Sequence, residues 1–527
     1  MKDVSLKTLR EDFDSYTISG NYIPKITTGL PRTIQSLCPE CLSVIPAEEY
    51  IVDGKVVVQK KCHKHGVFRD IVFSDAKLFL QMEKWRFGDG NGFSNPNVKS
   101  ATKCPHQCGI CNMHSTHTSM GNVDLTARCN LSCPVCYSDS NTNLYEPCFK
   151  DIIKMMQSLR EKRPVPAQSI QLLGGEPTMH PKFLDIVRSA RDMGFTHIQV
   201  ASNGIKFANP EFAIKARDAG LQYIYLQMDG VEDKVFEKIR GKGLLKIKLA
   251  VIESARKAGL RIIFVPTIVK GVNDNQIGPL IKLAFENLDV LSGISVQPIA
   301  FTGRCDETER LQKRFTLGDM AHEVGKQTGI TRTYEDWFPL SGITPFMKLG
   351  MALTGQALTN HACHPHCAIG TSLFIDENKN ATPAPRFLDL FNLLHEIDRL
   401  SKTIKKRKFK IFSEIKMLKI MRKYFDEKKA PQGLTFTKFL MTLDGYSGKK
   451  YTWSDQFKGH TFKTFFIIGM HFMDNYNYNL ERIRRCAVHY SAPNGMLYPF
   501  CAYNAGPTHR NKVERAFVKK KHDRINT

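Results

Sequence analysis

Between Gly121 and Gly303 the chain alternates short stretches rich in β-branched and aromatic residues with longer amphipathic stretches. The short stretches predict strands, and they are NVDLTA, QSIQLLGG, THIQVASNG, QYIYLQMDG, RIIFVPTIV and GISVQPIAF. Between them apolar residues recur at helical spacing, as in KFLDIVRSARDMG and LKIKLAVIESARKAG. Strands that alternate with helices predict an α/β fold of parallel βα units, curved into a partial (β/α)6 barrel. The functional loops of such a sheet lie at the carboxyl ends of its strands.

The segments on either side of this alternating region differ from it. Residues 1–120 are rich in cysteine and predict a small metal-binding module. Residues 311–527 predict a mainly helical domain, which contains the pair Cys486 and Cys501 near its end. We therefore expect three domains, with the α/β core at 121–310.

The chain has no stretch that predicts a membrane span. Its start, MKDVSLKTLREDFDSY, lacks the apolar segment and cleavage site of a secretory signal, so we expect a cytoplasmic protein. The most apolar stretches, GITPFMKLGMALTGQALT and TFKTFFIIGMHFM, are interrupted by Pro345, Lys348 and Lys463. They fall short of the roughly 20 apolar residues that cross a bilayer. Any contact with a membrane is therefore expected to be peripheral.

Fifteen cysteines are grouped closely along the chain, which favours metal sites over disulfides in a reducing cytoplasm. Two of them, Cys148 and Cys305, stand alone. The others form groups, which are Cys38, Cys41 and Cys62; Cys104, Cys108 and Cys111; Cys129, Cys133 and Cys136; and Cys363, Cys367, Cys486 and Cys501.

The net charge of +24 favours an anionic partner, which can be nucleic acid, an anionic lipid surface or a phosphorylated substrate. The excess is uneven along the chain. Residues 401–430 contain ten Lys and two Arg against three acidic residues, a net of +9. The sign of the charge alone does not choose among these partners.

The sequence RCNLSCPVCYSDS holds Cys129, Cys133 and Cys136 in a C-x3-C-x2-C spacing. Thiolates are soft ligands, and the short spacers let one loop bind three corners of a four-iron cluster. The fourth iron then lacks a protein ligand, and the amine and carboxylate of S-adenosylmethionine (SAM) can occupy it. For an isolated motif, a zinc site or unpaired core cysteines would be the alternative.

Residues at the ends of the following strands predict a cofactor site beside this motif. The second strand ends in a turn formed by Gly174, Gly175, Glu176 and Pro177. Its glycines let backbone carbonyls approach a ligand's ammonium group, and its glutamate can accept a further hydrogen bond. The next strand ends carry Ser202, Asn203, Gln227, Asp229 and Thr267. Such residues can merely cap helices, but so many at successive strand ends favour one shared site.

Together these motifs resemble the radical SAM superfamily. The resemblance implies that an electron from the cluster cleaves SAM to methionine and a 5′-deoxyadenosyl radical, which abstracts an unactivated hydrogen.

The remaining cysteine groups predict further metal sites. Cys38, Cys41 and Cys62 lie near His63 and His65, in a spacing typical of rubredoxins and zinc ribbons, with iron and zinc both open.

A second C-x3-C-x2-C group predicts another cluster at Cys104, Cys108 and Cys111. The candidates for its fourth ligand are His114, His117 and Cys148. A third cluster, structural or functional, is predicted where two distant pairs can meet, namely Cys363, Cys367, Cys486 and Cys501.

In the order of its motifs the chain resembles the tetraether lipid synthase family of radical SAM enzymes over nearly its whole length. The resemblance depends on LCPECLSVIPAE, CHKHGVFRD, CPHQCGIC, TARCNLSCPVCY, LLGGEPTMHP, YLQMDG, VPTIVKGVNDNQIG, QPIAFTGR and GMHFMDNYNYNLERIRRCAVHYSAPNGMLYPFCAYN. The chain departs from that family at Ser119, Met228 and Asn494, where Cys, Phe and Asp are common.

The resemblance implies hydrogen abstraction from terminal methyl groups of lipid chains and carbon–carbon coupling into membrane-spanning lipids. It also implies three four-iron clusters, a rubredoxin-like mononuclear iron, a low-potential electron donor and a lipid substrate with an anionic headgroup. Such an enzyme would lie at the cytoplasmic face of the membrane, and we expect no nucleic-acid partner.

Two stretches of sequence are consistent with a lipid substrate. In SEIKMLKIMRKYF and the residues just before it, apolar residues recur at helical spacing among basic ones. This pattern is typical of a helix that lies on an anionic surface, and equally of a core helix with one solvated face. These apolar residues are Ile411, Ile415, Leu418, Met421 and Phe425. An apolar tunnel is expected along Phe346, Met347, Met351, Leu353, Phe465 and Phe466, which can equally be plain core.

Two other functions compete with this one. A radical SAM methylase, or another enzyme that modifies a pterin or a peptide, would use the same core. A zinc-ribbon nucleic-acid-binding protein would account for the charge and the CxxC pairs, and it predicts zinc without iron and salt-sensitive binding.

Overall fold

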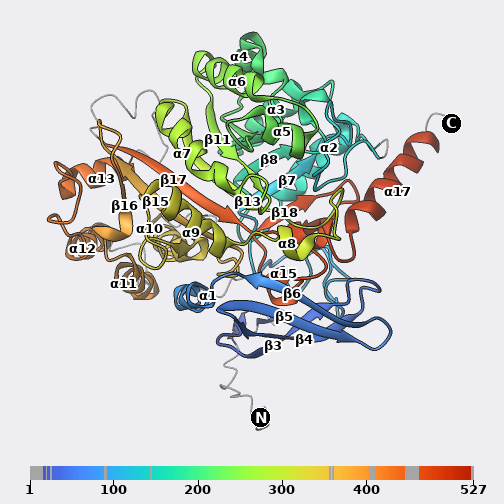
Figure 1. The fold of residues 1–527 in the computed structure, drawn as a ribbon, viewed down its shortest axis with the longest axis horizontal. Helices are drawn as coiled ribbons and strands as arrows, with labels where there is room; N and C mark the ends of the chain where they lie inside the picture. The colour runs from blue at the N-terminus through green and yellow to red at the C-terminus, as the bar shows by residue number, and fades with distance from the viewer. Residues whose placement is uncertain are drawn as a thin grey trace, which may run out of the picture.

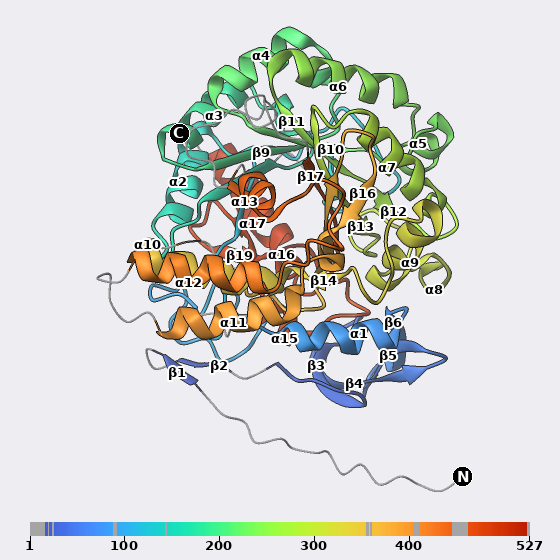
Figure 2. The ribbon, with the colours of Figure 1, turned by 90° about the vertical axis from the view of Figure 1, so that its left-hand side faces the viewer.

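The fold was obtained as a computed structural model, in which the described residues are 16–18, 21–23, 26–87, 92–142, 145–354, 358, 361–403, 410–444 and 462–523. Its centre is one large curved sheet with helices on its outer face (Figures 1 and 2). A smaller antiparallel sheet from the amino-terminal region lies at one end, in blue in Figure 1.

The predicted strands are all present and pair in parallel along the chain. They are β7 (Met120–Asp124), β8 (Ser169–Leu173), β9 (His197–Ser202), β10 (Tyr223–Gln227), β11 (Arg261–Val265) and β13 (Leu291–Pro298), with β12 (Thr267–Ile268) beside β13. All five residues of β11 are buried, and the last four, Ile262 to Val265, are apolar, as is usual in a covered parallel sheet. The α/β partial barrel predicted from the sequence is confirmed.

Helices connect these strands and cover the outer face. They are α2 (Phe149–Arg160), α3 (Phe183–Asp192), α4 (Pro210–Ala219), α5 (Asp233–Arg240), α6 (Leu245–Ala258) and α7 (Ile277–Glu286). Helix α4 shows why the boundaries fall where they do. Its cap Asn209 accepts from two backbone N–H groups, Pro210 opens the first turn, and Gly220 ends the helix in a left-handed conformation.

The carboxyl-terminal region completes the sheet, which the sequence did not predict. Strand β17 (Lys463–Met470) adds in parallel to β13, and β18 (Val488–Ser491) adds in parallel to β7. Antiparallel strands extend both edges, with β14 (Phe338–Pro339), β15 (Ala368–Ile375) and β16 (Ala381–Pro383) beyond β17, and β19 (Leu497–Pro499) beyond β18. Residues 311–527 therefore contribute strands to the core as well as helices.

The same region also contains helices. They are α8 (Arg310–Lys313), α9 (Leu317–Thr328), α10 (Thr344–Thr354), α11 (Leu390–Thr403), α12 (Lys410–Lys423), α13 (Phe436–Asp444), α15 (Leu480–Arg484), α16 (Phe500–Asn504) and α17 (His509–Asp523). No helix among the described segments is both long and apolar enough to cross a bilayer.

Helix α12 carries the stretch expected to bind a lipid surface. Met421 and, just beyond the helix, Phe425 are buried in a core cluster, whereas Ile415 and Leu418 are exposed. The side chain of Ile411 lies outside the described part of the structure. The spacing of the buried residues Met421 and Phe425 thus reflects ordinary packing of one face of the helix against the core.

The amino-terminal sheet contains β3 (Arg32–Leu37), β4 (Val44–Val52), β5 (Lys55–Cys62) and β6 (Gly66–Phe73), followed by α1 (Ala76–Met82). A short hairpin, β1 (Tyr16–Ile18) with β2 (Asn21–Ile23), precedes it. The sheet is joined to the barrel through Arg314, which is fully buried between Asp70 of β6 and Asp474.

Candidate active site and metal centres

The first cysteine motif follows β7 and opens onto a large cavity inside the half-barrel. Cys129, Cys133 and Cys136 line this cavity of about 1110 Å³ together with residues from each parallel strand. Burial, with smaller effects from Glu176 and the other two thiols, raises the pKa of Cys129 to about 12. A cationic iron centre would remove this cost by binding the thiolates, so the donor set fits a cluster. Ser140 approaches Cys136 Sγ with its hydroxyl (3.4 Å) and its backbone N–H (3.5 Å).

The Gly174–Gly175 turn packs against the backbone that leads into the cysteine motif. Backbone N–H groups of Gly175 and Glu176 donate to the carbonyls of Thr126 (2.7 Å) and Arg128 (2.8 Å). A Cβ atom at Gly175 would lie 2.3 Å from the Arg128 carbonyl oxygen. Both glycines also line the cavity. The absence of a side chain therefore lets the turn pack against the cysteine motif and leaves space in the cavity next to that motif.

The Glu176 carboxylate is directed into the protein rather than into the cavity. It accepts hydrogen bonds from Thr178, from the Ser202 hydroxyl (2.9 Å) and from the Asn203 backbone (2.9 Å). Glu176 is 1% exposed, and neither it nor Pro177 lines the cavity. The structure therefore gives Glu176 the role of joining two strand ends, where the sequence predicted a direct ligand contact.

Ser202 and Asn203 line the cavity at the end of β9. The Asn203 amide donates to Asn130 Oδ1 (2.7 Å) and lies 4.0 Å from Cys129 Sγ. The cluster motif and the third predicted strand end are therefore in contact.

The remaining predicted strand-end residues converge on Arg240, which the sequence analysis missed. Its guanidinium donates to both carboxylate oxygens of Asp229 (2.8 Å each) and to Thr267 Oγ1 (3.0 Å). With its amide oxygen turned toward Arg240, Gln227 accepts from the same group at 2.6 Å. Arg240 also donates to the Val135 carbonyl within the cysteine motif (2.9 Å). Gln227 and Thr267 line the cavity and Asp229 does not.

Arg304 is a second residue that the sequence analysis missed. It exchanges two backbone hydrogen bonds with Cys136 (2.9 Å each), and its side chain donates to the Cys133 carbonyl (3.2 Å). Neither Arg240 nor Arg304 differs by residue type or spacing from the other 73 of the chain's 75 basic residues. Only the folded contacts identify them as the residues that hold the motif.

The four-cysteine group predicted from two distant pairs is brought together. Cys363 and Cys367 precede β15, Cys486 follows α15 and Cys501 lies on α16. Burial, with a smaller effect from the Cys367 thiol, raises the pKa of Cys501 to about 12, since like charges at short range repel. Cys486 and Cys501 interact in the same way. The Met473 N–H donates to Cys501 Sγ (3.3 Å) and Arg482 to Cys367 Sγ (3.4 Å), contacts that suit a cluster-bound thiolate.

The other cysteine trio lies close to this group. Tyr478 is fully buried. Burial first, and then the charges of four thiols, raise its pKa well above its usual range. Two of these thiols come from this trio (Cys104 and Cys108) and two from the four-cysteine group (Cys486 and Cys501). Tyr478 and Cys501 belong to one buried cluster against which Cys104, Cys108 and Cys486 pack, so two of the predicted cluster sites are neighbours.

The side chains of the three candidates for the fourth ligand of the Cys104 trio have other partners in this structure, and the ligand stays a prediction. His114 Nε2 lies 2.9 Å from the Cys486 carbonyl and 3.0 Å from His489 Nε2. His117 packs its edge against Phe93, and Cys148 is exposed and contacts Asp151 (3.1 Å). The backbone N–H of His114 also donates to the Cys111 carbonyl (3.0 Å), so His114 is the candidate that contacts the trio's own loop.

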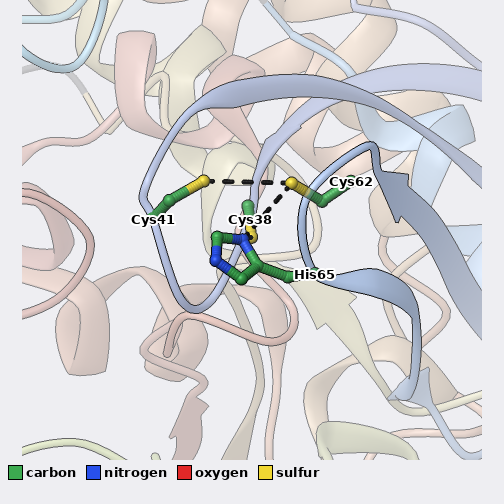
Figure 3. A group of neighbouring side chains, drawn as sticks. All are labelled: Cys38, Cys41, Cys62 and His65. Atoms are coloured by element: carbon green, nitrogen blue, oxygen red, sulfur yellow. Dashed lines mark hydrogen bonds between the residues drawn. The ribbon is translucent and has the colours of Figure 1, made fainter.

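The amino-terminal metal site has four converging ligand atoms (Figure 3). The turn after β3 supplies Cys38 and Cys41, and the turn from β5 to β6 supplies Cys62 and His65. His65 Nδ1 lies 3.5 Å from the sulfurs of both Cys38 and Cys62, and the Cys41 and Cys62 sulfurs are 3.9 Å apart. Tetrahedral bonds of about 2.3 Å to sulfur and 2.0 Å to nitrogen put ligand atoms at about these separations.

His65 completes the set, which the sequence left open between two histidines. Hydrogen bonding by Ser43 lowers the pKa of Cys41 to about 6, so that a thiolate is available near neutral pH. A Cys3His set suits a closed structural zinc site.

Replacing His65 with alanine is expected to remove about one metal ion per chain, because three ligands leave a structural site incomplete. Metal analysis of the purified protein by mass spectrometry measures this. His63→Ala is the matched control, since His63 is exposed and outside the four-residue set, and it should keep the metal. Full metal content in the His65 variant would contradict the ligand assignment.

Two family models match the chain. Residues 123–284 match the radical SAM superfamily, and residues 30–74 match the HMPTM N-terminal zinc ribbon domain. A 7,8-dihydro-6-hydroxymethylpterin dimethyltransferase of Methanocaldococcus jannaschii is 39% identical over 488 residues, which cover 92% of this chain and 94% of that protein. This chain belongs to the same family, within the radical SAM superfamily.

More distant matches cover smaller shares of the chain. A GTP 3′,8-cyclase of Marinobacter nauticus is 30% identical over 36% of this chain and 56% of its own length. The crystal structure of Streptococcus suis SuiB bound to S-adenosylmethionine covers 40% of this chain and 47% of its own, with 16% identity and a TM-score of 0.34. As a radical SAM enzyme the protein uses SAM and a four-iron cluster, which require an electron donor, and its zinc ribbon provides a further metal site.

The comparison contradicts the predicted coupling of lipid chains. The family member that matches nearly the full chain is named for a pterin dimethyltransferase and not for a tetraether lipid synthase. The lipid substrate and the membrane-face location also lack support. Of the residues expected to line an apolar tunnel, only Phe466 lines the cavity. The polar residues described below form much of the wall instead.

Proposed function

We propose that this radical SAM enzyme methylates a reduced pterin. The observation that carries the proposal is the 39% identity to a 7,8-dihydro-6-hydroxymethylpterin dimethyltransferase over 94% of that protein. The match covers 92% of this chain, so it includes most of the residues that build the site. This was the alternative activity that the sequence left open.

The cavity wall supports a polar heterocycle over an alkyl chain. The strands present Gln171, Gln199, Tyr225, Ser295 and Gln297 to the cavity. Tyr225 donates to Ser295 Oγ (2.6 Å) and Gln297 donates to Tyr225 (3.3 Å). An alkyl chain buried against these groups would leave their remaining donors and acceptors without partners, which costs about 1–3 kcal/mol for each unsatisfied group.

In this proposal the cysteine motif holds the cluster, and the bound cofactor supplies a radical that abstracts hydrogen. Gly174, Gly175, Ser202, Asn203, Gln227 and Thr267 form the wall against which SAM binds. Arg240 and Arg304 hold this wall and the cysteine loop in register, and Glu176 joins the strand ends. The other two cysteine groups hold further clusters, in the domain that follows residue 311 and the module before residue 120.

Anaerobic incubation with SAM, a low-potential reductant and 7,8-dihydro-6-hydroxymethylpterin tests the proposal. Mass spectrometry should show the pterin gaining the mass of one or two methyl groups, with 5′-deoxyadenosine formed only when the pterin is present. A methyl label in SAM then identifies the methyl donor. Recovery of unchanged pterin beside abundant deoxyadenosine would overturn the proposed substrate.

A further inference from the structure

Six neighbouring strands place a polar residue at the same level inside the half-barrel. The sheet register aligns Tyr490 with Asn122, Asn122 with Gln171, Gln171 with Gln199, Gln199 with Tyr223, and Tyr223 with Arg261. All six line the cavity. We call these residues the polar belt. In closed α/β barrels this space is usually filled by branched apolar side chains, so a polar belt around an open cavity calls for a polar occupant.

The amides at the centre of the belt are fixed in place but retain hydrogen-bonding capacity. The Gln199 amide donates to Gln171 Oε1, and its oxygen lies 2.8 Å from His197 Nε2. His197 in turn stacks on Tyr223, with ring centroids 4.6 Å apart. Each amide group has two donors and two acceptor positions, so both glutamines have more to offer than these contacts use.

Asn122 is the clearest sign of a missing partner. It is fully buried, and within the described structure neither its amide nitrogen nor its amide oxygen makes a well-formed hydrogen bond. The side chain of Tyr490, its partner in the sheet register, interacts with it. Buried amides are rarely left in this state, because the lost hydrogen bonds to water are not replaced. A ligand or ordered water in the cavity would supply them.

A pterin has a matching edge. Its pyrimidine ring presents a 2-amino donor, an N3–H donor and a 4-oxo acceptor in a row, and side-chain amides can pair with such an edge through one donor and one acceptor at once. Gln171 lies four residues before Gly175 along the same strand and turn, which corresponds to about 13 Å at 3.3 Å per residue. A two-ring heterocycle held by the belt would thus extend toward the cysteine motif with its second ring, which carries positions 6 and 7.

We propose that Asn122, Gln171 and Gln199 bind the pyrimidine edge of the substrate and determine its specificity. This inference rests on the proposed function and adds the orientation of the bound pterin. The belt selects rings that carry a 2-amino group beside a 4-oxo group and places their far carbons at the cluster.

Equilibrium dialysis of the anaerobic holoenzyme with SAM tests the inference. The probes are 6-hydroxymethylpterin and 6-hydroxymethyllumazine, in which an oxo group replaces the 2-amino group. The wild-type protein should bind the pterin on the order of tenfold more tightly, since one buried hydrogen-bonding pair is lost with lumazine. Gln171→Leu and Gln199→Leu should each weaken pterin binding by on the order of tenfold and reduce the preference over lumazine.

Gln157→Leu is the matched control, because Gln157 is exposed on α2, and it should behave as the wild type. The ratio of the two affinities does not depend on how much protein is folded, so it separates loss of recognition from loss of structure. Unchanged affinity and preference in both glutamine variants would overturn the belt assignment and leave the methylation assay intact. If the wild-type protein binds neither probe and leaves the dihydropterin unchanged, the proposed function fails instead.

Discussion

Replacing Cys133 with alanine is expected to remove about four irons per chain and to abolish the formation of 5′-deoxyadenosine. Cys133 is buried at the cavity wall, and two thiolates are too few to hold the cluster whose open iron binds SAM. Reductive cleavage of SAM requires that iron, so this variant should show no activity above the background of reductant alone. Iron and sulfide analysis and chromatography of the nucleoside product measure the two effects.

Two matched variants make this result specific. Cys148→Ala should keep all iron and activity, because Cys148 is exposed and contacts Asp151 at the start of α2. Cys486→Ala should also lose about four irons but should still cleave SAM, since Cys486 belongs to the separate group with Cys367 and Cys501. Cleavage of SAM by the Cys133 variant would contradict the assignment of the radical-forming cluster.

Local sequence patterns were sufficient to predict the strands and helices of the barrel core. The strands from β7 to β13 and the helices between them follow periods of two and 3.6 residues, which depend on near neighbours. Strand β17 was missed because its apolar stretch, KTFFIIGM, is compatible with a strand, a tunnel or a membrane contact. What makes it a strand is pairing with β13 and β15, about 170 and 95 residues earlier.

The same distinction applies to the site. The C-x3-C-x2-C motif is contained in one loop, so its spacing alone predicts a shared metal cluster. The roles of Glu176 and Asp229 depend on partners from other strands, and the structure directs both carboxylates inward. Arg240 joins the ends of β10 and β12 to the cysteine loop, a set of contacts that no local pattern reveals. His65 was separable from His63 only by its distance to the sulfurs.

The choice of substrate shows where sequence patterns mislead. Apolar residues at helical spacing among lysines, as in α12, occur both in membrane-binding helices and in ordinary core helices. The burial of Met421 and Phe425 is consistent with the second case. The polar belt, by contrast, is invisible in sequence because its six residues come from six separate strands. Their alignment appears only once the sheet register is known.

Replacing Arg314 with methionine is expected to destabilise the protein by about 3–5 kcal/mol, the usual cost of removing one partner from a buried ion pair. Arg314 is fully buried and donates to Asp70 (2.7 Å) and Asp474 (2.6 Å), which are also fully buried. These contacts join the zinc-ribbon sheet to the segment after β17. Without the guanidinium, two carboxylates remain in the interior, although Arg310 still reaches Asp70. Thermal melting and limited proteolysis of the anaerobic holoenzyme measure the loss.

The effect should depend on pH in a direction that the ion pair determines. Burial alone would raise the pKa of Asp474, but Arg314 and backbone hydrogen bonds leave it below the usual value. This pair therefore stabilises the wild-type protein fully above the unfolded carboxyl pKa of about 3.9 and is lost only as the pH falls through the lower folded value. In the variant, burial no longer opposed by Arg314 should raise the carboxyl pKa, so protonation begins at higher pH. The difference in melting temperature between the two proteins should consequently shrink from pH 7.5 to pH 5.5.

Arg332→Met, which removes an exposed pair with Glu335, should cost less than about 1 kcal/mol at either pH. A similar small loss for Arg314→Met, or a difference that grows as the pH falls, would show that the buried pair does not hold these parts together.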